Sequence, residues 1–193
     1  GSISRYKARL VAKGYDQKAG IDYKEVFAPV VKYVSLRLVL ALAAFMCWTV
    51  HQIDVDTAFL YAPMTEELYM KQPEGFEIPG PQGQKLVCKL KKSLYGTKQA
   101  SRNWNDTLCK TLKDLGFRQS MVDPGVFTSS VKDQMYILLV YVDDMIIVGP
   151  DVDYIEESKA RMAKIFKIKD LGEAQWILGI GVTTDKENRS KKI

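Results

Sequence analysis

The stretch Ile137-Leu138-Leu139-Val140-Tyr141-Val142-Asp143-Asp144-Met145-Ile146-Ile147-Val148-Gly149 decides how this chain folds. Its β-branched and aromatic residues on both sides of two aspartates predict two strands joined by a tight hairpin turn at Asp143-Asp144. This pair lacks the glycine that common two-residue turns prefer. Carboxylates beside an apolar interior are costly unless they are paired or bind a metal. The pair is therefore either an ordinary turn with solvated aspartates or part of a functional site.

A second acidic site favours the functional interpretation. Residues 50–61 are predicted as a strand that carries Asp54 and Asp56 on one side, although aspartate is depleted in strands. The alternative is an exposed strand end. If this strand lies beside the hairpin, Asp54, Asp143 and Asp144 converge at one sheet edge. Carboxylate oxygens of this kind suit two Mg²⁺ or Mn²⁺ ions and phosphoryl transfer.

Composition limits the class of protein. The 193 residues are 47% hydrophobic and 26% charged, which suits one compact unit with room for two subdomains. A net charge of +5 and a pI near 9.0 favour a polyanionic partner. Cys47, Cys88 and Cys109 have no paired spacing, so reduced thiols and no zinc site are expected. The single histidine, His51, excludes a multi-histidine metal site.

The first segment and the loop after residue 90 carry basic charge. As a strand, residues 5–14 would place Arg5, Lys7, Arg9 and Lys13 on one face, either for phosphates or for solvent. Residues 91–99 are the densest cationic segment, interrupted by Tyr95 and Gly96. That pattern suits nucleotide or nucleic-acid contact, with a solvated basic loop as the alternative.

Apolar residues at helical spacing predict three helices. The first is expected to be buried and to run from the N-cap Ser35 to Trp48, with these residues inward: Leu38, Leu42 and Phe45, and beside them Val39, Ala43 and Met46. The second runs from Trp104, in the core, to Leu115. The third begins at Asp151 or Asp153, with Ile155, Met162, Ile165 and Phe166 inward and Glu156, Lys159 and Lys164 outward.

Further strands are expected at residues 85–90, 126–128, 135–142 and 176–182. Residues 167–172 are predicted as a basic connection, and residues 183–193 as a charged, frayed tail. The first two residues, 1–2, are interpreted as a cloning remnant. The longest apolar run, 38–48, is too short to span a bilayer.

Five stretches together resemble the reverse transcriptase of copia-type LTR retrotransposons. Tyr141-Val142-Asp143-Asp144 resembles its Y-x-D-D box, and Gln52-Ile53-Asp54-Val55-Asp56-Thr57-Ala58-Phe59-Leu60 resembles the stretch with the first catalytic aspartate. Residues 5–14, residues 93–99, and residues 170–172 with 177–180 are similar to that family in order and spacing. The resemblance covers nearly the whole chain.

The resemblance implies a role for each matching residue. Asp54 and Asp143 would hold the two ions, Val55 would lend a backbone carbonyl, and Asp144 would support them. Phe59 would be the steric gate against a ribose 2′-hydroxyl. The remaining implied contacts are Lys7 and Arg9 with the incoming triphosphate, Tyr95, Gly96 and Gln99 with the nucleotide and template, Lys169 with the pyrophosphate leaving group, and Leu178 and Gly179 with the primer end.

The resemblance also implies an α+β fold: a polymerase palm, with an antiparallel sheet backed by helices, and a partial fingers subdomain, the thumb being largely absent. Fingers segments are expected at residues 3–32 and 62–99, and the palm at residues 33–61 and 100–182. Three departures from the family pattern remove no metal ligand: Thr97 for leucine, Ala100-Ser101 for Ser-Pro, and Asp56 for lysine.

The expected function is RNA- and DNA-templated DNA synthesis from dNTPs, with an RNA or DNA template and primer as partners. A homo-oligomer or contacts with other polyprotein segments are compatible with the sequence, and no membrane contact is expected. The expected location is intracellular, in a cytoplasmic virus-like particle or the nucleus. The alternative is a truncated or domesticated palm module that binds nucleic acid or a protein without polymerising. An RNA-dependent RNA polymerase is disfavoured by Tyr141-Val142 and by Phe59.

Overall fold

A computed structural model describes residues 6, 8–185 and 190–192. The chain divides into two compact units, one formed by residues 1–27 and 59–104 and the other by residues 28–58 and 105–193. The boundaries fall inside the 3₁₀ helix η2 (Ala58–Tyr61) and inside helix α2 (Ala100–Asp114). Each unit is therefore described by itself.

The second unit is built on a six-stranded antiparallel sheet with strand order β4-β5-β6-β7-β1-β8. The predicted hairpin is confirmed as the pair β6 and β7 in its centre, and the strand with Asp54 lies directly beside it. The strand bounds are β1 (Thr49–Val55), β4 (Arg118–Gln119), β5 (Val126–Val131), β6 (Gln134–Tyr141), β7 (Asp144–Gly149) and β8 (Ile168–Glu173).

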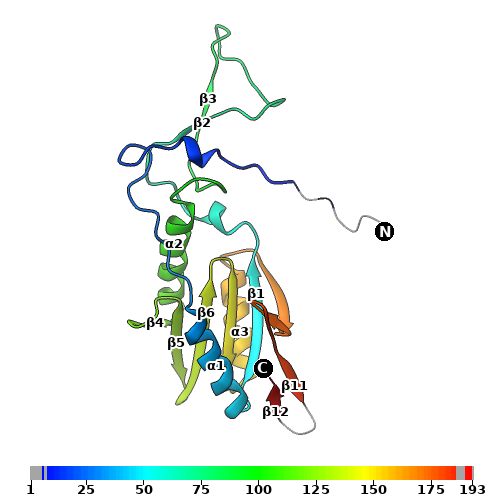
Figure 1. The fold of residues 1–193 in the computed structure, drawn as a ribbon. Helices are drawn as coiled ribbons and strands as arrows, with labels where there is room; N and C mark the ends of the chain where they lie inside the picture. The colour runs from blue at the N-terminus through cyan, green and yellow to red at the C-terminus, as the bar shows by residue number, and fades with distance from the viewer. Residues whose placement is uncertain (1–5, 7, 186–189, 193) are drawn as a thin grey trace. The chain divides into compact units, whose positions relative to one another are not determined.

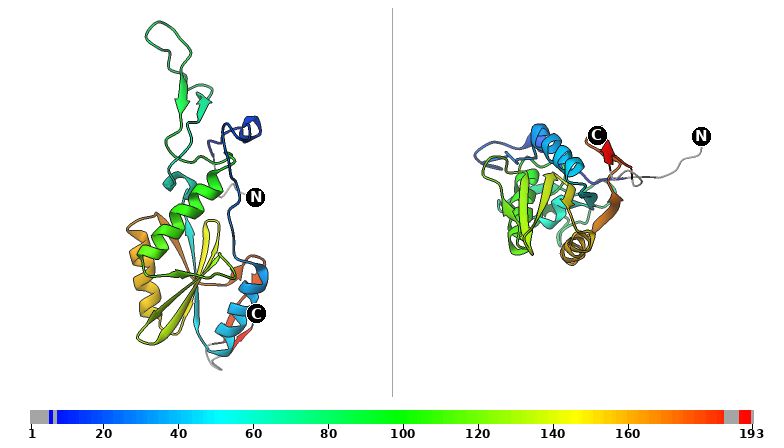
Figure 2. Two further views of the ribbon diagram at one scale, coloured as in Figure 1. Left: turned by 90° about the vertical axis from the view of Figure 1, so that its left-hand side faces the viewer. Right: turned by 90° about the horizontal axis from the view of Figure 1, so that it is seen from below.

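Helices cover both faces of this sheet. Helix α1 (Tyr33–Phe45) lies on one face, and α3 (Val152–Ala163) lies on the other with the C-terminal part of α2 (Figures 1 and 2). Strand β6 is buried at five successive residues, 136–140, because both of its faces are covered. This explains why the sequence of the hairpin is a continuous apolar run and does not alternate between apolar and polar residues.

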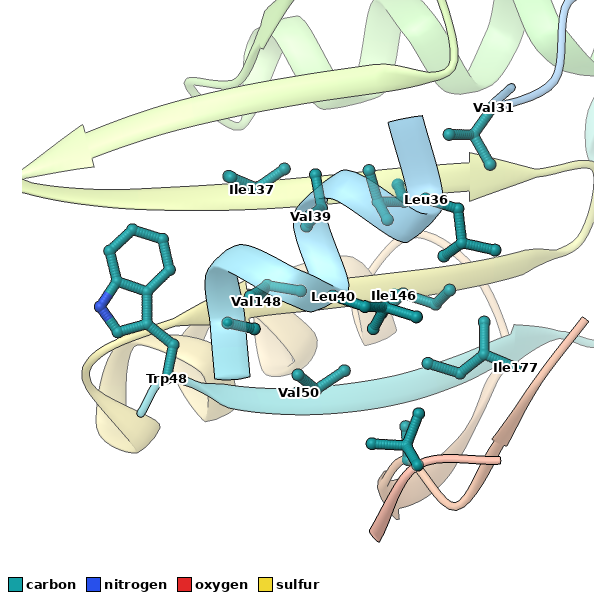
Figure 3. Packing of buried hydrophobic residues seen from close by; sticks show 14 residues of the cluster. Val31, Leu36, Val39, Leu40, Trp48, Val50, Ile137, Ile146, Val148 and Ile177 are labelled. Atoms are coloured by element: carbon teal, nitrogen blue, oxygen red, sulfur yellow. The ribbon is translucent and has the colours of Figure 1, made fainter. Parts of the chain in front are cut away.

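The packing of α1 differs from the prediction. Its buried residues are Leu36, Val39, Leu40 and Ala43, which lie against Val50, Ile137, Ile146 and Val148 of the sheet (Figure 3). Leu38 is 69% exposed and Phe45 is 85% exposed, so these two inward predictions were wrong. Val39 and Ala43, which were predicted beside them, are buried as expected, and the helix is buried on one side only. Because α1 is apolar nearly all round, its sequence does not distinguish the two faces.

The predicted N-cap Ser35 is also wrong. The N-cap of α1 is Lys32, three residues earlier, and it makes no side-chain cap hydrogen bond. Instead the backbone N–H of Lys32 donates to the buried carboxylate of Asp123 at 2.9 Å, and the N–H of Gly125 donates to it at 3.0 Å. Burial alone would raise the pKa of Asp123, but hydrogen bonds from Ser35, Lys32 and Gly125 lower it overall. A residue distant in sequence therefore supplies the cap.

The other two helices follow the predicted positions more closely. Trp104 in α2 is 1% exposed, as expected for a core residue. Asp151 caps α3 by accepting from the N–H of Asp153 at 3.0 Å. Two residues near this helix were placed wrongly: Ile165 is 47% exposed, and Lys159 is only 3% exposed.

The first unit contains little regular structure in its described residues. Residues 8–13, predicted as part of a strand, form no strand, and the 3₁₀ helix η1 (Gly14–Asp16) follows them; Arg5 and Lys7 lie outside the described residues. The expected strand at 85–90 is shorter, as β3 (Val87–Lys89), and pairs with β2 (Tyr69–Lys71). The strand expected over 50–61 ends at Val55, and η2 follows.

The C-terminal segment contains more strands than expected. Most of the predicted connection, residues 167–172, instead lies in β8 (Ile168–Glu173) at the sheet edge. The expected single strand at 176–182 is a short hairpin, β9 (Trp176–Ile177) with β10 (Ile180–Gly181). Part of the expected tail forms a further hairpin, β11 (Thr183–Asp185) with β12 (Ser190–Lys192). Among the described residues, no helix is both long enough and apolar enough to cross a bilayer.

Candidate active site

Three carboxylates gather at one end of the central sheet. Asp54 near the end of β1 is the register partner of Asp144 at the start of β7. The N–H of the next residue, Val55, donates to the carbonyl of Asp143 at 3.0 Å. Since hydrogen-bonded and non-hydrogen-bonded pairs alternate in antiparallel sheets, Asp54 and Asp144 form a non-hydrogen-bonded pair, in which facing side chains lie close together.

The turn itself differs from the prediction by one residue. Its central residues are Val142 and Asp143, and Asp144 already belongs to β7, opposite Tyr141. Val142 has φ 59°, a left-handed conformation that is unfavourable for a β-branched residue. Strain of this kind is concentrated at functional sites. The turn thus places consecutive carboxylates differently: Asp143 projects from the loop, and Asp144 lies in the sheet.

The site raises the cost of ionising Asp144. Its pKa is raised above the usual value, first by burial and then by repulsion from Asp143 and Asp54, while a hydrogen bond from Gln52 acts in the opposite direction. The Nε2 of Gln52 lies 3.4 Å from the Asp144 carboxylate. Asp143 and Asp54 therefore lie close enough to Asp144 to raise its pKa.

The donor set fits a hard divalent cation. Carboxylate oxygens and the backbone carbonyl of Val55 are the ligand types that Mg²⁺ and Mn²⁺ prefer. In the part of the chain that the structure describes, no three His, Cys, Asp or Glu side chains are grouped as a ready-made metal site. The fit therefore rests on the chemistry of the converging acids and on their mutual repulsion, which a cation would relieve.

Strand β8 brings cations to the same sheet edge. Lys169 is the register partner of Asp54, and directly facing residues of an antiparallel pair project to the same side. Two residues further, Lys167 Nζ lies 3.1 Å from a carboxylate oxygen of Asp56, and the N–H of Asp56 donates to the carbonyl of Lys167. Asp56, where the resembling family has lysine, is thus paired with Lys167, the residue just before β8.

In the first unit, Phe59, Tyr95 and Arg9 form a stack. The rings of Phe59 and Tyr95 lie 5.3 Å apart between centroids and are tilted by 41°, and the Arg9 guanidinium lies 5.7 Å from the Tyr95 centroid. Tyr95 is 54% exposed. An aromatic pair with a cation over one ring offers a surface for a base or sugar.

Two other predicted nucleotide contacts have structural roles in this unit. Gly96 has φ 93°, and a Cβ there would lie 2.2 Å from the carbonyl oxygen of Ala12, so only glycine allows this close approach. Gln99 is 1% exposed. Its amide accepts from Gln17 at 3.0 Å and donates to the carbonyl of Asp22 at 2.9 Å. Gln99 therefore holds the loops behind the stack together.

The predicted primer-end residues form a turn in the second unit. Leu178 and Gly179, with φ 46° and 87°, lie between β9 and β10, and two positive φ values are typical of a type I′ hairpin turn. The single-strand prediction missed this turn because leucine is unusual at such a position.

A charged cluster around the buried Lys159 was not predicted from the sequence. This side chain contacts His51, Glu156 and Asp170. The available signal was its spacing: Lys159 lies four residues after Ile155 and three before Met162, both fully buried, so it shares their face of α3.

The sequence profile of the family described as "Reverse transcriptase (RNA-dependent DNA polymerase)" matches residues 2–191. The chain is 48% identical over 188 residues to the "Retrovirus-related Pol polyprotein from transposon TNT 1-94" of Nicotiana tabacum. It is 43% identical over 183 residues to that from transposon RE1 of Arabidopsis thaliana, and 33% identical over 172 residues to the "Transposon Ty1-GR3 Gag-Pol polyprotein" of Saccharomyces cerevisiae.

These matches differ in how much of each protein they cover. They include 97%, 93% and 88% of this chain, respectively. The same matches span 14%, 12% and 9% of the three relatives. The chain thus corresponds to one segment of much longer polyproteins.

Proposed function

This chain belongs to the reverse transcriptase (RNA-dependent DNA polymerase) family, and we propose that it carries the centre for DNA synthesis from dNTPs on an RNA or DNA template. The second unit corresponds to the palm and the first to part of the fingers. The observation that carries the proposal is the convergence of Asp54 with Asp143 and Asp144 at the end of the β1–β7 pair.

The proposed roles follow from the chemistry of each side chain. Asp54, Asp143 and the carbonyl of Val55 hold two divalent ions, and Asp144 supports them. When bound, these ions stabilise the attacking and leaving oxygens of the phosphoryl transfer. Lys169, opposite Asp54, can donate a proton to the departing pyrophosphate.

The stack in the first unit supports the proposed choice of nucleotide. Phe59, held against Tyr95, would exclude a ribose 2′-hydroxyl by its bulk. Arg9, whose guanidinium lies near the Tyr95 ring, would contact the triphosphate together with Lys7, which lies outside the described residues. Tyr95, Gly96 and Gln99 would shape the pocket, and Leu178 with Gly179 would contact the primer end.

Primer extension tests the proposed function directly. Wild-type chain with a primed RNA or DNA template, dNTPs and Mg²⁺ should extend the primer, and Asp54→Asn should not, because the amide replaces an anionic ligand while keeping the shape. Asp106→Asn, an exposed acid of α2, is the control and should extend normally. Equal extension by wild type and Asp54→Asn would refute the assignment of Asp54.

The second candidate function is binding of nucleic acid or a protein without DNA synthesis. The net charge of +5 favours a polyanionic partner for such binding. If phosphates are the target, the affinity should fall with salt with a log–log slope of about −0.7 to −0.9 per phosphate neutralised. Lys91→Ala with Lys92→Ala should make this slope shallower by about one to two units.

The matched control for this slope is Lys110→Ala with Lys113→Ala on α2, two lysines that are also exposed. It should leave the slope unchanged. Binding that does not change from low to moderate salt would exclude phosphate-dominated binding and favour a protein partner.

A further inference from the structure

A buried lysine connects helix α3 to the sheet edge that carries Asp54. Lys159 is 3% exposed. Its Nζ lies 2.6 Å from His51 Nδ1 on β1, 2.8 Å from Glu156 on its own helix, and 3.0 Å from both carboxylate oxygens of Asp170 on β8. Three N–H donors therefore meet three partners. The lysine side chain is 4% exposed, whereas those of its acidic partners Glu156 and Asp170 are about half exposed, so removing the lysine would leave two carboxylates without this partner.

His51 acts here as an acceptor. Burial and then the charge of Lys159 lower its pKa, against the opposing effect of the nearby acids Glu156, Asp170 and Glu173. The neutral ring can accept at Nδ1 from Lys159, with its proton on Nε2. The cluster is thus an ammonium group held by two carboxylates and one neutral imidazole.

The Asp170 carboxylate also accepts from the backbone N–H of Gly172 at 2.8 Å. Gly172 has φ 70°, and the pairing of β1 with β8 shifts by one residue at this point. Gln52 faces Gly172, whereas the next residue of β1, Ile53, faces Asp170. Leu171 is therefore the extra residue of a β-bulge, and the Asp170 side chain spans it.

The bulge decides which charges face each other beyond it. With the bulge, Asp54 faces Lys169, and the ion pair between Asp56 and Lys167 forms at 3.1 Å. Counting the same strands without the extra residue would put Asp170 opposite Asp54 and Ile168 opposite Asp56. A one-residue slip would thus replace a cation by an anion beside Asp54 and remove the observed ion pair.

We propose that Lys159 and Asp170 are positioning residues: the ion pair between the buried lysine and the half-exposed carboxylate locks the bulge at Leu171 and so places Lys169 opposite Asp54. This inference rests on the proposed function only for its catalytic consequence. The bulge and its register are properties of the fold, and they can be measured whether or not the chain polymerises.

Disulfide trapping measures the register without any activity. In one protein Asp56 and Lys167 are replaced by cysteine, and in a second protein Asp56 and Ile168. Directly facing residues of adjacent strands have Cα separations within the range that a disulfide tolerates. Oxidation in dilute protein, followed by peptide mass spectrometry, should give mainly the 56–167 bridge in the wild-type background.

Lys159→Met should change this outcome. The ratio of the 56–167 to the 56–168 bridge should fall by about tenfold or more, because the half-exposed Asp170 carboxylate has lost the ion pair that holds it across the bulge. Lys164→Met, an exposed lysine at the end of the same helix, is the control and should leave the ratio unchanged. If circular dichroism shows that Lys159→Met does not fold, Asp170→Asn is the variant that tests the proposal. Its side-chain amide can still accept from the N–H of Gly172, but the negative charge that pairs with Lys159 is gone. A wild-type ratio in the folded variants overturns the proposal.

The catalytic consequence has a separate readout. In primer extension, Lys159→Met and Lys169→Met should each lower kcat with little change in the KM for dNTP, and their effects should not add in the double variant. Additive losses would mean that Lys159 does not act through Lys169. If wild type itself shows no primer extension, the proposed function fails. The disulfide-trapping experiment still tests the β1–β8 register, because it does not depend on activity.

Discussion

Asp143→Asn should abolish DNA synthesis and, in the absence of metal, raise the melting temperature. The expected loss of activity is on the order of a thousandfold or more, because each 1.4 kcal/mol of lost transition-state stabilisation slows a reaction about tenfold and bound ions contribute several kcal/mol. The variant keeps the shape of the turn while removing one of three neighbouring negative charges.

The gain in stability follows from the sign of the Asp144 shift. The pKa of Asp144 is raised in the folded state, first by burial and then by Asp143 and Asp54. The folded protein therefore binds this proton more tightly than the unfolded chain, and stability falls as pH rises from the unfolded pKa through the folded pKa. Above the folded pKa the full cost is present. Removing the charge of Asp143 should relieve part of it, raising the melting temperature by roughly 1–3 °C after solvent screening.

Mg²⁺ should stabilise wild type far more than this variant. At a concentration about 100 times Kd, linkage adds about 2.7 kcal/mol, which is roughly 5–10 °C for a chain of this size. Melting curves with and without Mg²⁺ measure both effects. Asp133→Asn, in the β5–β6 turn at φ 61°, is the matched control, because asparagine tolerates that conformation. An undiminished Mg²⁺ shift in Asp143→Asn would rule out the shared carboxylate site.

Phe59→Ala should relax the choice between deoxyribonucleotides and ribonucleotides. Phe59 follows Asp54 by five residues and its ring is held against Tyr95, so it is a fixed steric element rather than a mobile side chain. The ratio of rNTP to dNTP incorporation, measured as kcat/KM for each, should rise on the order of a hundredfold, the scale on which pocket shape discriminates.

Two further variants serve as controls for the sugar preference of Phe59→Ala. Phe76→Ala removes a 78% exposed phenylalanine of the same unit and should leave the ratio at its wild-type value. Tyr95→Leu should raise the ratio less than Phe59→Ala, because it loosens the ring without removing it. If DNA synthesis by Phe59→Ala persists with unchanged sugar preference, Phe59 is a packing residue and the steric gate lies elsewhere.

The sequence by itself determined the central hairpin, the strand beside it and the family. Strong apolar runs of β-branched residues from 137 to 149 have few alternatives to strands, and the acids at Asp54 and Asp143-Asp144 interrupt them where a strand former would otherwise stand. The family resemblance is confirmed by the profile match over residues 2–191 and by the plant transposon relatives. Local chemistry was sufficient because each of these features depends on neighbours within a few residues.

Only the tertiary structure decided which faces are buried and which distant groups meet. Helix α1 is apolar nearly all round, so nothing in its sequence showed that Leu38 and Phe45 are exposed. Asp123 caps that helix from another part of the chain. Lys159 is buried because His51 and Asp170, on two different strands, supply its partners, and the extra residue Leu171 follows from that contact. Long-range hydrogen bonds and ion pairs leave no periodic signal in a sequence, so these features depend on the folded sheet.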